Sequence, residues 1–249
     1  MAGALFARPS LAERSHRGPA VSKRLLLYVE GQTEELFVNR ILRNHLATFG
    51  VQVERPVLAI TRPGPEERRG GFVNWPAVES DLRTLFASRR DPELRFSTLL
   101  DVYGVPEQMP GYPGASCGHR STAEVDAIEA AWTDHFSESR FVPYLQRHEF
   151  EALVIANPPS LDAVAPGHLA GIQTIIHPTA SALSAEDIDD GPTTHPSARL
   201  AQAISDYPDR KASYALFTLL DAGLDRVRQR CPRFDAWVER WEQWGHPRE

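Results

Sequence analysis

Apolar residues in the first half of the chain occur either in short continuous runs or at helical spacing. Residues 24–29 form an apolar run without a helical period, which is typical of a strand buried on both faces of a parallel sheet. Apolar side chains then recur at helical spacing as far as Leu46, and Thr33 is placed to cap this helix, with Glu34 and Glu35 in its first turn. The pattern therefore predicts a strand, a turn and a helix.

The same alternation continues along the chain to residue 145. It predicts further strands and helices in the order strand 51–60, helix 75–86, strand 96–102, helix 123–136 and strand 141–145. A loop rich in glycine and proline, residues 104–118, precedes the second of these helices. Strands that alternate with helices indicate an α/β fold, with a mostly parallel sheet flanked by helices.

The part of the chain beyond Ala156 contains no clear strand pattern. Its periodicity predicts three helices, over residues 197–204, 210–221 and 234–244. We therefore expect three regions: a flexible leader over residues 1–22, an α/β core over 23–156, and a helical C-terminal subregion over 157–249 that packs on the core.

Composition narrows the class of protein without deciding its substrate. The chain has 249 residues, 42% of them hydrophobic, which is enough for a substantial core. Its two cysteines, Cys117 and Cys231, have neither zinc-site spacing nor disulfide density, and no apolar run approaches the roughly 20 residues needed to cross a bilayer. We expect a cytoplasmic protein without membrane contact. The net charge of −6 removes the strongest global sign of a nucleic-acid binder but allows a local basic patch.

Two acidic residues, Glu30 and Asp101, directly follow apolar strand segments. In an open parallel sheet, ligands bind beyond the C-terminal ends of the strands, where these side chains would meet. Two carboxylates brought together in this way suit Mg²⁺ or Mn²⁺. Each acid alone could equally cap the following helix or turn, but two acids at matching strand ends favour a shared metal site.

Several segments carry a resemblance to a known family. They are residues 29–35 (VEGQTEE), 100–106 (LDVYGVP), 147–153 (RHEFEAL), 195–200 (HPSARL) and 231–237 (CPRFDAW). Together they resemble the Toprim-like domain-of-unknown-function family 4276 over residues 23–241. The resemblance implies a Toprim fold, the metal-dependent catalytic domain shared by topoisomerases, primases and overcoming-lysogenization-defect nucleases.

The resemblance also assigns roles to individual residues. The Toprim glutamate falls on Glu30, and the first acid of the Toprim Asp-x-Asp motif falls on Asp101. The second acid is replaced by Tyr103, so that a metal held in the full Toprim manner would lack one ligand. The natural substitutes are Glu149 and Glu151, which share a face if the segment is extended and diverge by about 200° if it is helical. The likeness of residues 151–156 to a helix start in related proteins favours Glu151, with Glu149 second.

Other residues are weaker candidates for the same site. Glu34 could add a metal ligand, although acids are common in a first helical turn. His148 could act as a general base or have a structural role. Phosphate-binding candidates are the loop arginines Arg62, Arg68 and Arg69 and a second group, Ser197, Arg199 and Lys211; surface and helix-cap roles are the alternatives. Trp237, Trp241 and Trp244 lie on one helical face and could pack on the body or on a partner.

The leading functional hypothesis is a metal-dependent nuclease in which Glu30, Asp101 and Glu151 hold the metal and DNA or RNA is cleaved. The resemblance further implies an ATPase of the ABC or AAA class encoded nearby and a role as effector in defence against phage. The sequence has no Gly-x-x-x-x-Gly-Lys-Ser/Thr loop, so ATP dependence would come from that partner. The alternatives are a non-catalytic partner-binding subunit of an ATPase complex and a small-substrate phosphoryl-transfer enzyme.

Overall fold

The computed structural model describes residues 23–59, 74–103, 105–112, 121–188, 191 and 193–246. The expected leader and the loop that carries Arg62, Arg68 and Arg69 lie outside these residues, as does much of the loop expected over 104–118. No helix in the described ranges is long and apolar enough to span a bilayer.

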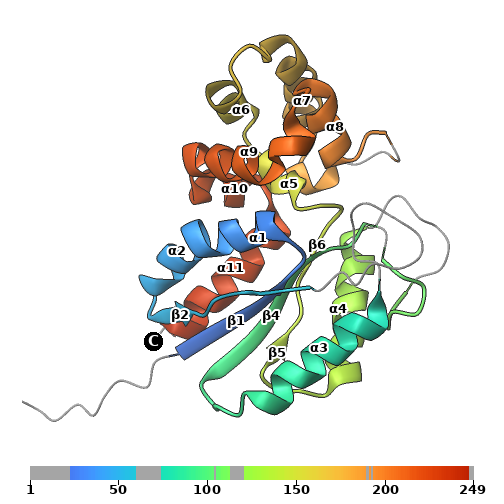
Figure 1. Ribbon diagram of the computed structural model, residues 1–249, viewed down its shortest axis with the longest axis vertical. Coiled ribbons are helices and arrows are strands. Elements are labelled where there is room, and N and C mark those ends of the chain that lie inside the picture. Colours follow the sequence, from blue (N-terminus) through green and yellow to red (C-terminus); the bar gives the residue numbers. More distant parts are fainter. Residues whose placement is uncertain are drawn as a thin grey trace, which may run out of the picture.

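A parallel sheet lies at the centre of the molecule (Figure 1). Its strands are β1 (Lys23–Val29), β2 (Val51–Val53), β3 (Val57–Leu58), β4 (Leu94–Asp101), β5 (Phe141–Val142) and β6 (Leu145–Gln146). The long strands β1 and β4 pair with each other; β2 and β3 follow one another along the free edge of β1, and β5 and β6 along that of β4. Every pairing between these strands is parallel, which confirms the predicted α/β class.

Two of the predicted strands are interrupted. The strand expected over 51–60 is divided into β2 and β3, and the one expected over 141–145 into β5 and β6. Pro56 and Pro143 lie within the two breaks, and a proline has no amide hydrogen to donate to a neighbouring strand. Pairing resumes beyond the first break, where the Ala59 N–H donates to Val29 O at 2.8 Å, so the edge keeps its direction.

Helices cover both faces of the sheet (Figure 1). One face carries α3 (Trp75–Ser88) and α4 (Thr122–Phe136); the other carries α1 (Gln32–Phe37), the π-helical η1 (Val38–Leu42), α2 (Arg43–Ala47) and α11 (Pro232–Gly245). Strand β1 contributes to the hydrophobic cores on both faces of the sheet, because its side chains point alternately to one face and the other. Leu25, Leu27 and Val29 pack with the α1 and α11 side, whereas Leu26 and Tyr28 pack with the α3 and α4 side.

The first helix begins two residues earlier than a Thr33 cap would place it. Gln32 is its first residue, Gly31 precedes it, and Thr33 is buried inside the first turn, so the predicted Thr33 cap is wrong. The Glu34 carboxylate instead accepts the Gly31 backbone N–H at 2.9 Å. The turn after β1 is thus closed by an acid that the sequence pattern had placed in the first helical turn.

A layer of helices lies beyond the C-terminal ends of the strands (Figure 1). It contains α5 (Glu151–Val154), α6 (Pro158–Val164), α7 (Leu169–Ser181), the 3₁₀ turn η2 (Ala185–Asp187), α8 (Pro196–Ala203), α9 (Tyr207–Ala222) and α10 (Leu224–Arg230). The helices predicted over 197–204, 210–221 and 234–244 correspond to α8, α9 and α11. The pattern did not predict α5, α6, α7 and α10, because three of them are shorter than two and a half turns and α7 contains Pro178.

Helix α11 packs on the sheet and is not part of this helical layer. The Trp237 ring stacks on Tyr144 at 4.7 Å between centroids, and its Nε1 donates to the Ser97 hydroxyl at 3.0 Å. Trp241 is buried in the same core, with Trp244 packed against it. The tryptophan face of this helix therefore packs on the body of the protein.

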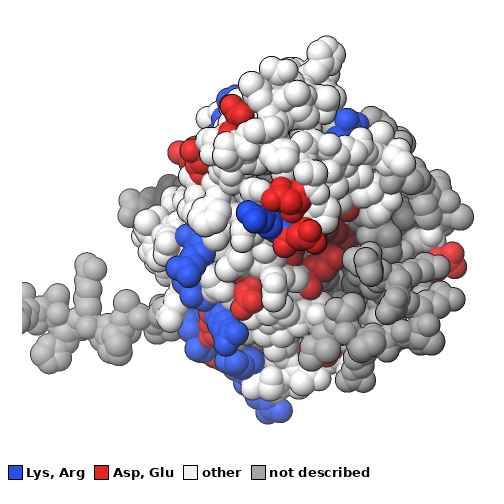
Figure 2. All heavy atoms as spheres, turned by 45° about the horizontal axis from the view of Figure 1, so that its top comes forward, with Lys and Arg blue, Asp and Glu red and all other residues white. Residues whose placement is uncertain are grey.

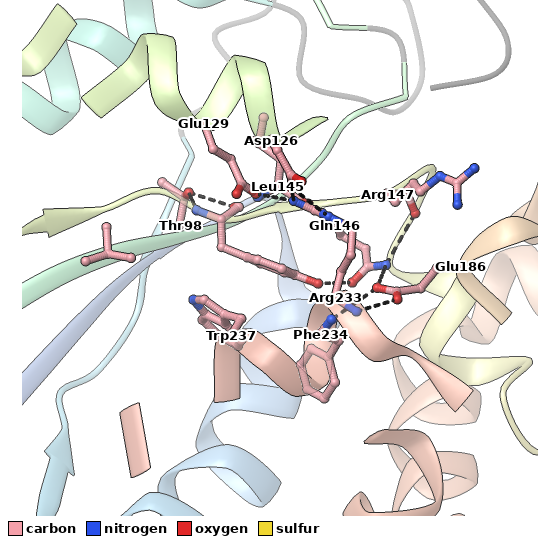
Figure 3. Close-up of polar contacts among 12 residues, drawn as sticks. Thr98, Asp126, Glu129, Leu145, Gln146, Arg147, Glu186, Arg233, Phe234 and Trp237 are labelled. Atoms are coloured by element: carbon pink, nitrogen blue, oxygen red, sulfur yellow. Dashed lines mark hydrogen bonds and ion pairs between the residues drawn. The ribbon is translucent and has the colours of Figure 1, made fainter. Parts of the chain in front are cut away.

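The start of α11 is held by a polar network (Figure 3). The buried Glu186 carboxylate accepts the backbone N–H groups of Arg233 at 2.9 Å and Phe234 at 3.2 Å, which have no partner within the helix. The Arg233 guanidinium donates to Leu145 O at 2.9 Å and pairs with Glu129 at 3.0 Å. These contacts join α11 to β6, α4 and η2.

Removing the Glu186 carboxylate should destabilise the protein. Two buried N–H groups would lose a charged acceptor, so Glu186→Ala should lower the free energy of unfolding by about 2–4 kcal/mol, measured by urea denaturation. Asp162→Ala removes an exposed carboxylate with no hydrogen-bond partner among the described residues and should stay within about 0.5 kcal/mol of wild type. Equal losses in the two variants would contradict the capping role.

Candidate metal and phosphate site

Glu30 and Asp101 meet at the C-terminal ends of the two central strands. The parallel register pairs Val29 with Leu99, so Glu30 leaves β1 beside the last residues of β4. One carboxylate oxygen of Glu30 accepts the Asp101 backbone N–H at 3.0 Å, and Asp101 is 8% exposed. The two acids that the sequence placed at matching strand ends are therefore neighbours.

The chain makes a strained turn as it enters the site from β6. His148 is buried and has a positive φ of 63°, which is uncommon for a residue other than glycine. Its carbonyl oxygen accepts the Tyr103 backbone N–H at 2.9 Å, and Asp101 accepts the Phe150 N–H at 2.8 Å. This turn places Glu149 just before α5 and Glu151 as the first residue of that helix.

Glu151 contacts groups on α9. Its Oε1 pairs with the Lys211 ammonium at 2.8 Å and accepts a hydrogen bond from the Tyr207 hydroxyl at 3.3 Å. Its Oε2 is buried with no hydrogen-bond partner, and the residue is 0% exposed. An orphaned carboxylate oxygen in the interior is costly, because a buried charge needs a partner.

Glu149 is bound by the start of α8. The Ser197 backbone N–H and hydroxyl donate to its two oxygens at 2.8 and 2.9 Å, and His195 Nδ1 lies 3.0 Å away. The His195 ring packs on Tyr103 at 4.9 Å between centroids. Glu149 and Glu151 thus turn to different partners, and Glu149 links the helical layer to the sheet.

The neighbouring carboxylates raise one another's pKa values. Burial is the largest cause for each of Glu30, Glu34, Asp101 and Glu151, and repulsion from the other acids adds to it. The pKa of Glu34 rises to about 7, and the pKa of Asp101 rises well above its ordinary value. Burial alone would lower the pKa of Lys211, but Glu151 and Asp101 raise it, so the ammonium stays charged.

The donor chemistry of this cluster fits a hard divalent cation. We call the carboxylates of Glu30, Glu34, Asp101, Glu149 and Glu151 the acid cluster. Among the described residues, no three His, Cys, Asp or Glu side chains lie close enough together to hold a metal ion, and most oxygens of the cluster are bonded to the protein's own donors. The orphaned Glu151 Oε2 and the mutual repulsion of the acids are what a divalent cation would relieve.

Acidic and basic side chains lie near one another on one face. Figure 2 shows Asp and Glu side chains near the middle of this face with basic side chains directly beside them, and more Lys and Arg side chains toward the lower left edge. Of the predicted phosphate-binding residues, Lys211 and Ser197 reach the acid cluster. Arg199 donates to Thr194 O within the turn that precedes α8.

Sequence reasoning missed two residues that contact the acid cluster. Tyr207 has no recognisable signal, since it is an ordinary apolar position at the start of a helix. His195 opens one of the segments of the family resemblance but was given no role. Its signal is local, because His195 precedes a proline and caps α8, where its Nδ1 accepts the Ala198 N–H at 3.4 Å.

Comparison with known proteins gives one match. A family model described as a domain of unknown function (DUF4276) matches residues 29–242. No curated protein and no solved structure matches the chain. The matched residues include the whole acid cluster and Lys211.

The raised pKa of Glu34 predicts that metal-free protein loses stability as the pH rises. With a pKa of about 7 in the folded state and 4.5 as the ordinary value, the folded protein binds more protons across this interval. The free energy of unfolding should therefore fall between about pH 4.5 and pH 7, by up to about 3 kcal/mol from this group. Urea denaturation in EDTA at a series of pH values measures the slope.

Glu34→Gln keeps an acceptor for the Gly31 N–H but cannot ionise, so its stability should depend less on pH across that interval. Asp162→Asn, a change at an exposed helix position, should keep the wild-type slope. A Glu34→Gln profile parallel to that of wild type would show that Glu34 titrates normally.

Proposed function

We propose that this chain, which belongs to the DUF4276 family, is a divalent-metal-dependent nuclease that hydrolyses phosphodiester bonds of DNA or RNA. The proposal rests on the acid cluster at the carboxyl ends of adjacent parallel strands. The resemblance of the chain to Toprim domains points to the same chemistry. The fold and the family would not be enough without the acid cluster, because a shared fold can host several activities.

The observation that carries the proposal is the buried, unpartnered oxygen of Glu151 beside other acids with raised pKa values. A protein that needed these acids only as helix caps would have no reason to bury them together, since each raises the cost of ionising the next. Mg²⁺ or Mn²⁺ would balance that charge once the side chains of Glu30, Asp101 and Glu151 turn toward it, since as described no three acids lie close enough together to bind the ion. Glu149 is a weaker candidate because donors of α8 bind both of its oxygens, and Glu34 because it already closes the turn at Gly31.

A bound divalent ion would supply an activated water and stabilise charge on the phosphate oxygens. The residues of the chain then have separate tasks. Lys211 brings a permanent positive charge to the cluster and can contact a substrate phosphate. Glu149, through Ser197 and His195, fixes the helical layer over the strand ends and so orients the α5 segment that carries Glu151.

The resemblance also supports a partner for this activity. We include in the proposal an ABC- or AAA-class ATPase encoded nearby, with the chain as the nuclease effector of an anti-phage system in the cytoplasm. The chain lacks an ATP-binding loop motif of its own, which is consistent with a division of labour between two proteins.

A second candidate function is a non-catalytic partner-binding subunit. Lys211 already neutralises part of the acid cluster, as a structural ion would. Two large apolar side chains on α9, Phe217 at 55% and Leu220 at 50% exposure, also lie one turn apart and could contact a partner. This function predicts that the acids matter for folding and not for cleavage.

Replacing an acid of the cluster by its amide should remove metal binding without unfolding the protein. Asp101→Asn and Glu151→Gln should abolish Mn²⁺ binding measured by calorimetry. In EDTA, Asp101→Asn should melt at the wild-type temperature or a few degrees higher, because a repelled buried charge is gone. Glu151→Gln should melt lower, because it also breaks the buried ion pair with Lys211.

The control for this comparison is Asp162→Asn, which should bind Mn²⁺ as wild type does. Wild-type protein that binds no Mn²⁺ would contradict the metal site. Variants that lose both Mn²⁺ binding and their fold would identify the acids as structural, and Glu30→Gln, which retains an acceptor for the Asp101 N–H, would then separate the two roles.

Cleavage should require the metal and the acids together. Purified protein with Mn²⁺ or Mg²⁺ should cut DNA or RNA, and Glu30→Gln and Asp101→Asn should reduce the rate at least about 100-fold, measured on labelled polynucleotides. Lys211→Met should lower the rate while leaving Mn²⁺ binding intact. If the protein hydrolyses a small phosphodiester but leaves polynucleotides uncut, it is a small-substrate phosphoryl-transfer enzyme instead.

A further inference from the structure

We propose that a groove beside the edge strand β2 binds the phosphates of a nucleic-acid strand that continues from the acid cluster. This inference rests on the proposed nuclease function and names where its substrate lies. The groove has a volume of about 880 Å³ and runs between α2 and the β2 edge. Its polar lining comprises Arg43, Asn44, Gln52, Glu54 and Arg55.

The exposed arginines at this groove are paired only weakly, or not at all, with carboxylates of the described residues. The Arg55 side chain is 84% exposed, and its ion pair with Glu35 is long, at 3.6 Å. Arg40 lies outside the groove lining, on η1; it is exposed, and within the described ranges its guanidinium has no carboxylate partner. Exposed guanidinium groups that are weakly paired are free to bind phosphate oxygens.

The one carboxylate in the groove wall does not cancel this charge. Glu54 already pairs with Arg24 at 3.0 Å and with Arg89 at 3.3 Å, so its charge is balanced by arginines that are not part of the groove lining. Positive charge is therefore concentrated here, on a chain whose net charge is −6. Figure 2 shows Lys and Arg side chains gathered toward one edge of the face that also carries the acidic side chains.

The groove is connected to the acid cluster by helix α1. Arg55 pairs with Glu35, the residue after Glu34 of the cluster. The helical segment from Gln32 to Ala47 spans about 24 Å at 1.5 Å per residue. The Arg55 end of the groove therefore lies next to the acid cluster, and its α2 end lies farther along the same helical segment.

The lining favours a nucleic acid over a protein partner. Of its apolar members, Val51 and Val53 are buried in the core and only the small Ala47 side chain is exposed, and no aromatic side chain lies among the described residues of the groove. Protein interfaces rely on an apolar or aromatic centre, whereas a phosphate backbone needs arginines and amides. Arg43, Asn44, Gln52 and Arg55 supply the second kind of surface.

The test compares two double variants that remove equal charge. The groove variant, Arg40→Gln with Arg55→Gln, removes one arginine of the groove lining and one exposed arginine of the preceding η1. The control variant, Arg83→Gln with Arg226→Gln, removes exposed arginines on α3 and α10. Fluorescence anisotropy with labelled oligonucleotides of increasing length is measured in metal-free buffer, where the strand stays intact, at several salt concentrations.

We expect the groove variant to bind about three- to tenfold more weakly than wild type and to lower the salt dependence by about one to two released counterions. The loss should be larger for strands long enough to reach across the groove than for strands that end at the acid cluster. The control variant should match wild type on every strand.

The outcomes separate this inference from the proposed function. A wild-type protein that binds and cuts oligonucleotides, with a groove variant that behaves identically, overturns the groove and leaves the nuclease. A wild-type protein that neither binds nor cuts them overturns both. Competition by polyglutamate as strong as by an oligonucleotide of equal charge would show that the groove takes acidic polypeptides, and would also overturn the inference.

Discussion

The parallel pairing of β1 with β4 is the constraint on which the remaining structure depends. It aligns Val29 with Leu99, so the chain delivers Glu30 and Asp101 to the same place, and the Glu30 carboxylate then bonds the Asp101 amide. Both strands are buried on both faces and cannot slide by one residue without exchanging the two cores that they serve. The position of the acids is therefore set by packing rather than by their own interactions.

The acid cluster is also the point where the helical layer meets the sheet. Lys211 and Tyr207 reach Glu151 from α9, while Ser197 and His195 reach Glu149 from α8. The cost of burying several acids is thus offset by donors that lie far away in sequence. The helical layer stabilises the site electrostatically, and the site in turn fixes the layer to the strand ends.

The sequence predicted the elements that have a strong period and the acids that follow directly from them. Glu30 and Asp101 could be found because each ends an apolar strand, and Glu151 because the family resemblance pointed to it. The contacts of Glu149 could not be predicted, since they depend on the left-handed turn at His148 and on α8, which lies more than 40 residues away in the chain. Thr33 was misplaced because its hydroxyl resembles a cap, while the actual closing group, Glu34, acts backward from within the helix.

The placement of α11 affects how the protein is made. This helix ends at Gly245, yet it packs on β2 and α2, and its first turn is fixed to η2, β6 and α4. Such contacts join residues far apart in sequence and are slow to form. During synthesis on the ribosome, the sheet would lack one of its covering helices until nearly the whole described chain had emerged. The donors of the acid cluster on α8 and α9, Ser197, Tyr207 and Lys211, also lie late in the chain, so a nascent chain would lack both this cover and these partners until then.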